Sequence, residues 1–542
     1  MSIARASLWM ASGTIVSRIL GLVRTVMLAG AIGITNNEAD AFGVANQLPN
    51  NVYAIIVGGL LNAVLVPQIV RAKVRKDGGQ GYIDGLLTVI ITVFAFITLL
   101  ATMAAPLLVR LYTSGWDNDT LALATAFAYW CLPQLFFYGL YSILGEVLNA
   151  RSSFGPFMWA PVLNNIVAIV GLGAFVALYG GVGAQHTWTN AQITLLAGTA
   201  TLGVASQALI LFFFWKRIGL RFTFNFKLRG LGLRPALKAA TWTLAMLVIT
   251  QLGGLIQTNL TSSTLAARTA TSGDTMIGIA SVAVAGTAWL IFMIPHSVGT
   301  VSIATAYFTR MSEHAHAKNF DALKTDVVQA VRSILALSAI ASAVMIVLAL
   351  PIGSVFSANY QPAVALGLVL IAMMVGLIPF SINFMLQRVF YALEDTKSPF
   401  VFTTIQIVVF VIGSYVCASL VPASALVAAI SLVMSVSFVF QAGLAHIMLT
   451  KRIGKLTQGH LIRYGAQVVL AGLVAGGIGA ATLWAIGGVG SGSFAMGGAL
   501  PALLACVLVG VVCVLVYVGV LWFAKNQEVR SAVSALRGIL RR

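Results

Sequence analysis

The chain has 542 residues, of which 59% are hydrophobic and 8% are charged, and its mean hydropathy is +0.96. Soluble proteins carry charge on about a quarter of their residues, so this composition excludes a soluble globular protein and predicts an all-α integral membrane protein. The net charge of +18 does not require a nucleic-acid partner, because the basic residues gather in the loops expected on one side of the membrane.

Apolar runs of about 20 residues, the length that crosses a bilayer, predict about 14 transmembrane helices. Arg18 and Arg24 interrupt the first run and no small-residue cleavage site ends it, so it is interpreted as a membrane helix and not as a signal peptide. The expected spans are residues 8–32, 41–69, 86–111, 121–149, 157–179, 191–215, 236–259, 276–307, 327–350, 362–392, 400–421, 424–449, 464–487 and 498–524.

The first span contains the stretch SRILGLVR, residues 17–24, which begins with Ser17 and carries Arg18 and Arg24. Each guanidinium at the bilayer centre costs roughly 2.5 to 3.5 kcal/mol, so both arginines are expected to face protein, water or an anion. Six residues on an α-helix correspond to about 9 Å of rise and roughly 120° of rotation. The two arginines can therefore line one wide cavity at two depths, but they cannot form a narrow clamp.

Polar residues mark the beginning of the second span, in the stretch DAFGVANQLPNN that opens with Asp40 and includes Asn50. Such side chains are costly on a lipid-facing surface, so this part of the helix is expected to face protein or a ligand. Two interpretations follow. Either Asp40 neutralises one arginine in a buried network, or the arginines hold a bound anion. One carboxylate cannot neutralise two arginines, whereas an anion with two or more charges can.

A faint internal repeat links LNARSSFGPF, after the fourth span, to FYALEDTKSPF, after the tenth, with Ala150 paired to Ala392 at a separation of 392 − 150 = 242. Because six helices, an even number, separate the two stretches, the halves would lie parallel in the membrane, a known transporter plan. This predicts two six-helix lobes around a central cavity. Their ranges are 1–217 and 218–450, and residues 451–542 supply helices 13 and 14 and a basic tail.

Three further residues are candidates for coupling or gating. Glu146 and Arg388 lie near the cytoplasmic ends of helices 4 and 10, where each either takes part in transport or simply pairs with a neighbour or snorkels. His296, beside Pro295, either titrates during transport or is a hydrogen-bonded histidine at a proline kink.

No metal-ligand cluster, phosphate loop or nucleophile motif occurs in the sequence, so neither a metal, a cofactor nor an enzymatic activity is expected. The four cysteines sit in apolar runs as small hydrophobes, and His314 and His316 are expected in a cytoplasmic loop. Basic residues follow helices 2, 6 and 12, while the opposite loops contain acids and glycines. This asymmetry predicts that both termini are cytoplasmic.

The stretches SRILGLVR, EADAFGVANQLPN, LVPQIVRA and LNARSSFGPFMWAPVLNN resemble the bacterial lipid II flippase family MurJ, also called MviN, of the multidrug/oligosaccharidyl-lipid/polysaccharide exporter superfamily. The resemblance implies two lobes around a central cavity, a groove for the lipid tail at helices 13 and 14, and a location in the bacterial cytoplasmic membrane. It also implies movement of undecaprenyl-diphosphate-linked peptidoglycan precursor from the inner to the outer leaflet. Arg18, Arg24 and Asp40 fall on positions where that family carries functional residues.

The chain departs from the family pattern at Tyr53, where many members have an arginine, at Gly58 and Gly59, and in helix 8, which has no arginine before Pro295. The expected partners are a lipid-linked diphosphate, membrane lipids and the cell-wall synthesis and division machinery. Three other interpretations remain open: a flippase for another diphosphate-linked glycan such as an O-antigen or capsule unit, an exporter of cationic drugs, and a non-transporting cell-wall scaffold. A cation exporter would favour intramembrane carboxylates over arginines.

Overall fold

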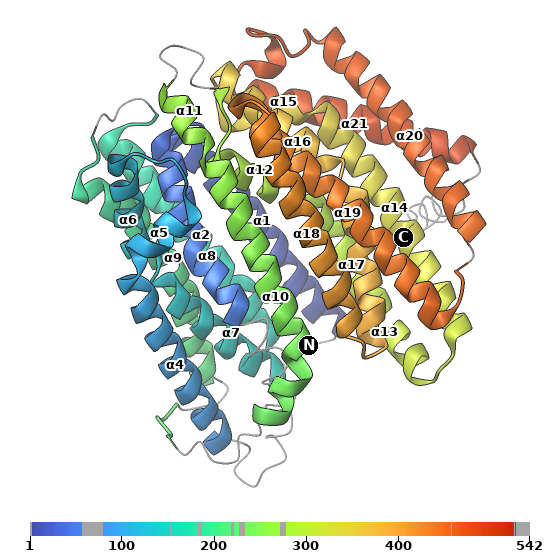
Figure 1. Cartoon of the computed structure of the whole chain (residues 1–542), viewed down its shortest axis with the longest axis horizontal. Helices are drawn as coiled ribbons and strands as arrows, with labels where there is room; N and C mark the ends of the chain where they lie inside the picture. The colour runs from blue at the N-terminus through green and yellow to red at the C-terminus, as the bar shows by residue number, and fades with distance from the viewer. Residues whose placement is uncertain are drawn as a thin grey trace. The chain divides into compact units, whose positions relative to one another are not determined.

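The computed structural model describes residues 3–56, 80–151, 153–182, 187–217, 222–226, 233–270, 278–456, 458–524 and 526. All regular elements within these ranges are helices (Figure 1). Twelve of the described helices are long and apolar enough to cross a membrane, and a pair bent by 46° would make a thirteenth. The all-α membrane fold is thus confirmed. The expected second span is described only to Ile56, so the count of fourteen stays a prediction.

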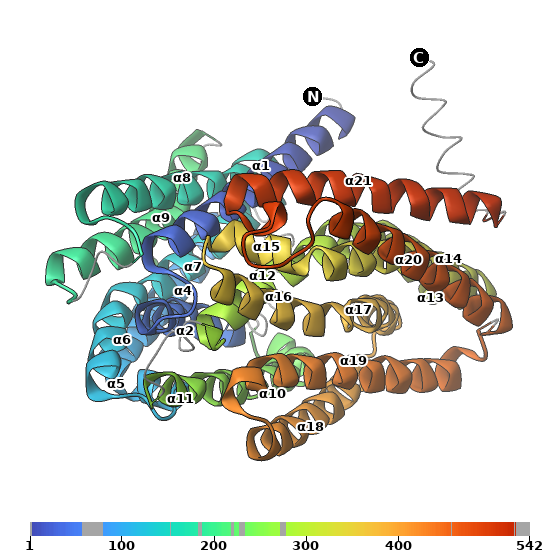
Figure 2. The same ribbon diagram turned by 90° about the horizontal axis from the view of Figure 1, so that it is seen from above.

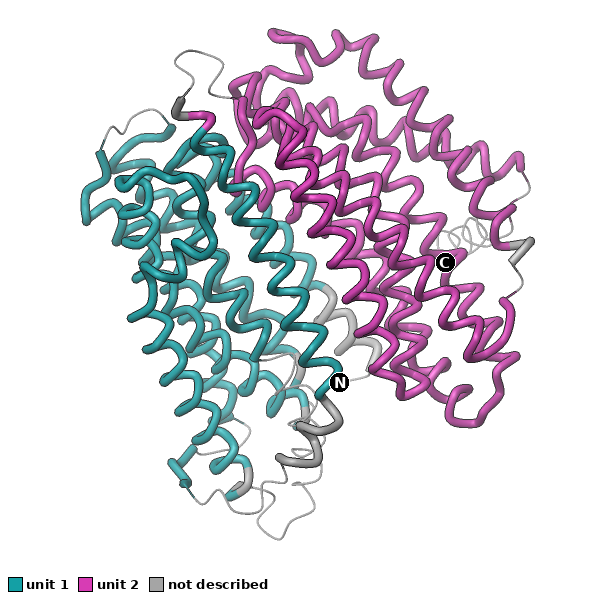
Figure 3. Tube along the Cα trace, in the orientation of Figure 1, with its two compact units in different colours: residues 1–266 teal, residues 267–542 magenta. Residues whose placement is uncertain are grey.

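The chain divides into two compact units, residues 1–266 and 267–542 (Figure 3). The helices of unit 1 are α1 (Ile3–Ile32), α2 (Asn37–Ile56), α4 (Gln80–Met103), α5 (Ala105–Tyr112), α6 (Asn118–Cys131), α7 (Gln134–Ala150), α8 (Phe154–Tyr179), α9 (Asn190–Arg217) and α10 (Leu233–Ser262). Helix α11 (Thr264–Ala270) contains the boundary.

Unit 2 is also helical, with one π-helical turn and one 3₁₀ turn among its described elements. These elements are α12 (Val282–Pro295), η3 (His296–Thr300), α13 (Val301–His316), α14 (Phe320–Val347), α15 (Ala349–Phe356), α16 (Tyr360–Met374), α17 (Leu377–Ala392), α18 (Lys397–Leu420), α19 (Ala423–Ile453), α20 (Gln458–Ala485), η4 (Phe494–Met496) and α21 (Ala499–Phe523). Its largest described core forms where apolar faces of α13, α14, α17, α19 and α20 meet.

Helix α10 belongs to unit 1 by its contacts, although the sequence places it with the second lobe. The Gln251 side-chain amide donates to the Asn51 carbonyl of α2 at 2.8 Å, and that of Asn259 donates to the Thr113 carbonyl after α5 at 3.2 Å. The compact units are defined by contacts, whereas the predicted lobes are defined by the internal repeat, so the two divisions need not agree. The lobe boundaries at residues 217 and 450 therefore stay a prediction.

The internal repeat is visible in the helix boundaries. A shift of 242 residues brings the ends of α4, α5, α6, α7 and α8 to within two residues of those of α14, α15, α16, α17 and α18. The turns agree as well, because Ser153 N–H donates to the Leu148 carbonyl at 2.8 Å and Asp395 N–H donates to the Phe390 carbonyl at 2.9 Å. The repeat inferred from two short stretches is confirmed over five consecutive helices.

Several details differ from the sequence expectation, including breaks at Ala104 and Leu348 within the expected third and ninth spans. Helix α13 continues to His316, so His314 and His316 lie on its last turns and not in a loop. Helix 4 is broken into α6 and α7 at residues 132–133, and helix 10 is broken into α16 and α17 at 375–376. Pro133 accounts for the first break because a proline cannot donate to the preceding turn.

Candidate functional site

Helix α1 is placed by close packing on α8, and the two run side by side in both views (Figures 1 and 2). Gly13, Ser17 and Gly21 recur every four residues and so lie on one face of α1. A Cβ at Gly13 would lie 2.8 Å from the Trp159 ring, and the Asn165 side-chain amide donates to the Ser17 carbonyl at 2.9 Å. Small residues allow the two backbones to approach closely, as is usual between membrane helices.

Arg18 lies outside this contact face. It is exposed, and so are its neighbours Ile15 and Ile19, each at 58%. No hydrogen bond or ion pair to Arg18 occurs within the described part of the chain. The side chain therefore projects from a face of α1 that unit 1 leaves uncovered.

Arg24 is partly buried and lies close enough to Tyr138 of α7 and Cys131 of α6 for its charge to act on both groups. The Tyr138 hydroxyl donates to Gln134 Oε1 at 3.1 Å, and Gln134 Nε2 donates to Asn46 of α2 at 3.2 Å. Arg24 itself has no hydrogen-bond or ion-pair partner among the described residues. Tyr138 and Cys131 lie near Arg24, but no carboxylate forms an ion pair with it among the described residues.

Asp40 does not neutralise either arginine. It is fully buried near the beginning of α2, just after the turn that joins α1 to α2. Arg24 precedes the end of α1 by eight residues, which is about 12 Å along the helix, and Arg18 lies about 9 Å further away. No ion pair links Asp40 to Arg18 or Arg24 in the ranges that the structure describes. This geometry does not support the interpretation of a buried Asp–Arg network.

Asn50 is exposed, whereas the next residue, Asn51, donates to the Tyr112 hydroxyl at 3.3 Å. The hydroxyl of Tyr53, the residue that stands where many family members carry an arginine, is hydrogen-bonded to Ser142 of α7. Gly58 and Gly59 lie outside the described residues. Glu146, one turn beyond Ser142, is half-buried and has no hydrogen-bond or ion-pair partner among the described residues.

In unit 2, His296 is buried at the beginning of the π-helical turn, and its Nδ1 lies 3.2 Å from Ser381 Oγ. Its ring contacts Phe380 and Phe384, with centroid distances of 4.5 and 5.1 Å. This is the hydrogen-bonded arrangement beside a proline that the sequence offered as one of two interpretations. The guanidinium of Arg388 lies 5.0 Å from the centroid of the Phe384 ring, a cation–π contact.

The family model described as lipid II flippase MurJ matches residues 28–496. The chain belongs to the MurJ family. A probable lipid II flippase MurJ from Rhizobium tropici is 27% identical over 422 residues, covering 76% of this chain and 74% of the relative.

Solved structures share the fold of this MurJ-family chain. A lipid II flippase MurJ in an inward closed conformation has a TM-score of 0.72 at 18% identity and covers 96% of this chain and 100% of that chain. A MATE crystal structure in complex with MaL6 has a TM-score of 0.58 at 17% identity, over 84% of this chain and 96% of that one. At these identities the likeness shows the fold alone.

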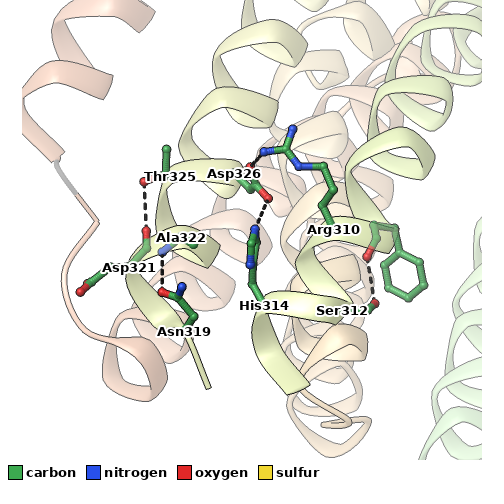
Figure 4. Close-up of polar contacts among 9 residues, drawn as sticks. Arg310, Ser312, His314, Asn319, Asp321, Ala322, Thr325 and Asp326 are labelled. Atoms are coloured by element: carbon green, nitrogen blue, oxygen red, sulfur yellow. Dashed lines mark hydrogen bonds and ion pairs between the residues drawn. The ribbon is translucent and has the colours of Figure 1, made fainter. Parts of the chain in front are cut away.

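The sequence reading missed one polar cluster of the MurJ-family chain, at the turn between α13 and α14 (Figure 4). Asp326 is buried and accepts from Arg310 Nη2 at 2.6 Å, while His314 Nε2 lies 3.4 Å from its second oxygen. The i, i+4 spacing of Arg310 and His314 was the available signal, because it places both on one helix face. Within the described residues, no group of three or more histidine, cysteine or acidic side chains could hold a metal ion.

Proposed function

We propose that this MurJ-family chain moves lipid II, the undecaprenyl-diphosphate-linked peptidoglycan precursor, from the inner to the outer leaflet by alternating access. Family membership supports the substrate class, since the Rhizobium tropici relative is named a probable lipid II flippase. No covalent step is needed, because transport changes only the side of the membrane that the substrate faces. The chain therefore acts as a transporter and not as an enzyme.

The observation that carries the proposal is the absence of a protein partner for Arg18 and Arg24 among the described residues of a membrane-spanning helix. Two guanidinium groups in a low-dielectric region require counter-charge, and a diphosphate supplies two or more negative charges. Each planar guanidinium can donate two hydrogen bonds to phosphate oxygens, which are strong because both partners are charged. The diphosphate is the part of the substrate that these arginines hold.

The positions of the two arginines along α1 give the order in which the substrate meets them. With the N-terminus in the cytoplasm, α1 runs outward, so Arg18 lies about 9 Å nearer the cytoplasm than Arg24. Arg18 is exposed and receives the diphosphate first, whereas Arg24 holds it deeper, beside Tyr138. Rocking of the two predicted lobes then opens the cavity to the other side.

The remaining predicted site residues have secondary roles in this proposal. Ser17 accepts from Asn165 through its carbonyl and hydroxyl oxygens, which fixes the register of α1 and so positions Arg18. Asp40, near the beginning of α2, is assigned to the outer end of the path, and Asn50, about 15 Å further along α2, to its middle. Glu146 and His296 are assigned to coupling or gating, and Arg388, whose guanidinium contacts the Phe384 ring, to a smaller part in it.

The proposal also covers the location of the protein in the cell and its partners. Both termini lie in the cytoplasm of a bacterium and the protein lies in its cytoplasmic membrane; the basic residues after helices 2, 6 and 12 support this orientation. The partners are lipid II, membrane lipids and the machinery of cell-wall synthesis and division. A flippase for another diphosphate-linked glycan would use the same arginines, so the accumulated precursor must be identified in the experiment.

The experiment replaces Arg18 and Arg24 with alanine, singly and together, in a strain depleted of its own flippase. We expect normal membrane abundance, loss of growth, and accumulation of lipid II on the cytoplasmic leaflet. Lysine at either position should rescue growth only in part, because it keeps the charge but loses the planar fork. The matched control is Arg110→Ala, which removes an exposed arginine in the last turn of α5.

Full growth of the double alanine variant would overturn the assignment of the diphosphate to these arginines. Accumulation of a different lipid-linked glycan, without lipid II, would favour the other flippase interpretation. Growth arrest with no accumulated lipid-linked precursor would favour the scaffold interpretation over transport.

A further inference from the structure

A short extended segment after α9, residues 222–226 with the sequence FTFNF, is fixed to the beginning of α4. The Thr223 hydroxyl donates to Asp84 Oδ2 at 2.6 Å. The Asn225 N–H donates to the Thr88 hydroxyl at 2.9 Å, and its side-chain amide donates to the Gly81 carbonyl at 3.1 Å. These three bonds attach alternate residues of the segment to one helix, as expected for an extended chain with a period of two.

The three phenylalanines of the same segment form a row. Successive ring centroids are 4.9 Å apart for Phe222 and Phe224 and 6.4 Å apart for Phe224 and Phe226. Phe224 is 65% exposed and Phe226 is 69% exposed. Adjacent exposed aromatic rings at a fixed position indicate an interaction surface rather than a core.

The row lies at the level where two membrane spans end. The span in α4 begins at Ile83, and Asp84, which accepts from Thr223, is its second residue. The span in α9 ends at Arg217, five residues before Phe222, and the Arg217 guanidinium lies 4.6 Å from the centroid of the Phe213 ring. Aromatic and basic residues together at the end of a span are typical of the membrane–water interface.

Charge complements the aromatic row. Lys216 and Arg217 are exposed at the end of α9. From Lys216 to Lys238 the sequence contains no acidic residue, and its bases are Lys216, Arg217, Arg221, Lys227, Arg229, Arg234 and Lys238. A basic stretch beside a membrane span attracts anionic lipid headgroups.

We propose that Phe222, Phe224 and Phe226 insert into the boundary between headgroups and acyl chains of the cytoplasmic leaflet, with Lys216 and Arg217 on anionic headgroups. The occupant of this surface is the bilayer itself, because exposed rings and adjacent bases match its apolar and anionic layers. The segment attaches the chain after α9 to the membrane surface near the beginning of α4. The proposal does not rest on the transport function.

The test uses the full-length protein with all four cysteines replaced. This cysteine-free protein is first checked to have the melting temperature of the wild type. Single cysteines at Phe224 and Phe226 carry spin labels, and the protein is reconstituted in phosphatidylethanolamine vesicles with or without phosphatidylglycerol. Depth is measured by the ratio of collisions with oxygen and with a water-soluble nickel chelate. Phe96→Cys, exposed within α4, and Ser491→Cys, in the loop between α20 and α21, are the membrane and water references.

We expect labels at 224 and 226 to collide with the nickel chelate at least about threefold less often than the label at 491. Phosphatidylglycerol should lower these collisions further, and Lys216→Gln with Arg217→Gln should reduce the phosphatidylglycerol effect. Collision rates equal to those at 491 in both kinds of vesicle would overturn the proposal. Labels that are exposed in vesicles but shielded in native membranes would indicate a protein partner and would also overturn it.

Discussion

Arg18 and Arg24 of α1 differ from three arginines of unit 2, Arg310, Arg332 and Arg388, in how the fold holds them. Arg18 and Arg24 have no hydrogen-bond or ion-pair partner among the described residues. In unit 2, Arg310 pairs with Asp326, and the guanidinium of Arg332 lies 4.5 Å from the centroid of the Tyr464 ring. Arg388 lies over Phe384. A guanidinium with a partner in the fold stabilises the fold, whereas one without a partner is available to a ligand.

The largest effect expected from this comparison concerns Arg310. Arg310→Ala leaves the buried Asp326 carboxylate with His314 alone, which should lower the free energy of unfolding by about 2 kcal/mol. This is less than the about 3 to 5 kcal/mol of a fully buried pair, because the Arg310 side chain is 59% exposed. Arg18→Ala should not lower stability at all. Thermal unfolding of the purified variants measures both.

Two controls sharpen this prediction. Adding Asp326→Asn to Arg310→Ala should recover most of the loss, because no buried charge then remains unpaired. Lys324→Ala removes a pair whose acid, Asp321, is 95% exposed, so its effect should stay below about 0.5 kcal/mol. If Arg18→Ala proved as destabilising as Arg310→Ala, the distinction between the two groups of arginines would be wrong.

Glu146 and Arg388 occupy equivalent positions of the repeat, since 146 + 242 = 388. They allow the same comparison between a charged residue without a partner and one that has a partner. Glu146 has no ion-pair or hydrogen-bond partner among the described residues, whereas Arg388 is held by an aromatic ring. We expect Glu146→Gln to slow transport about fivefold without changing the melting temperature.

Arg388→Gln should instead lower stability by about 0.5 to 1 kcal/mol, the range of a cation–π contact, with transport within about twofold of the wild type. Flipping in vesicles and thermal unfolding separate the two outcomes. The reverse pattern would make Arg388 the coupling residue of this pair.

Hydropathy predicted most of this fold because membrane helices must satisfy their backbone groups internally and therefore appear as long apolar runs. The separation of 242 residues, inferred from Ala150 and Ala392, holds over five helices because each repeat has the same helix lengths. The division after Ala266 could not be predicted, since it depends on which groups α10 meets, including the Asn51 backbone carbonyl that accepts from Gln251.

The sequence predicted the charged residues of the site but not which side chains pair with them. The cost of Arg18 and Arg24 in a membrane is a property of the sequence alone. Whether Asp40 reaches them depends on depth, and the structure places Asp40 just beyond the C-terminal end of α1. Likewise the contact of Asp326 with Arg310 depends on how α13 turns into α14, which no spacing rule specifies.

A further difference in stability separates the two turns of the repeat. Asp395 accepts from the N–H groups of Lys397 and Ser398 at 3.0 and 2.9 Å, in the first turn of α18. The equivalent residue, Ser153, makes no such bond with α8. Removing a cap of this kind costs about 1 kcal/mol, so Asp395→Ala should lower stability by that amount and Ser153→Ala by a few tenths at most.

The reason for this difference is itself testable. The position equivalent to Ser398 is Pro156, since 398 − 242 = 156, and a proline has no N–H to donate. An aspartate at 153 can therefore accept from Gly155 but not from the next residue. Ser153→Asp should stabilise the protein by less than about 0.5 kcal/mol in thermal unfolding, half of what Asp395 contributes. A gain equal to the loss in Asp395→Ala would mean that the missing N–H of Pro156 does not explain why the first turn lacks the cap.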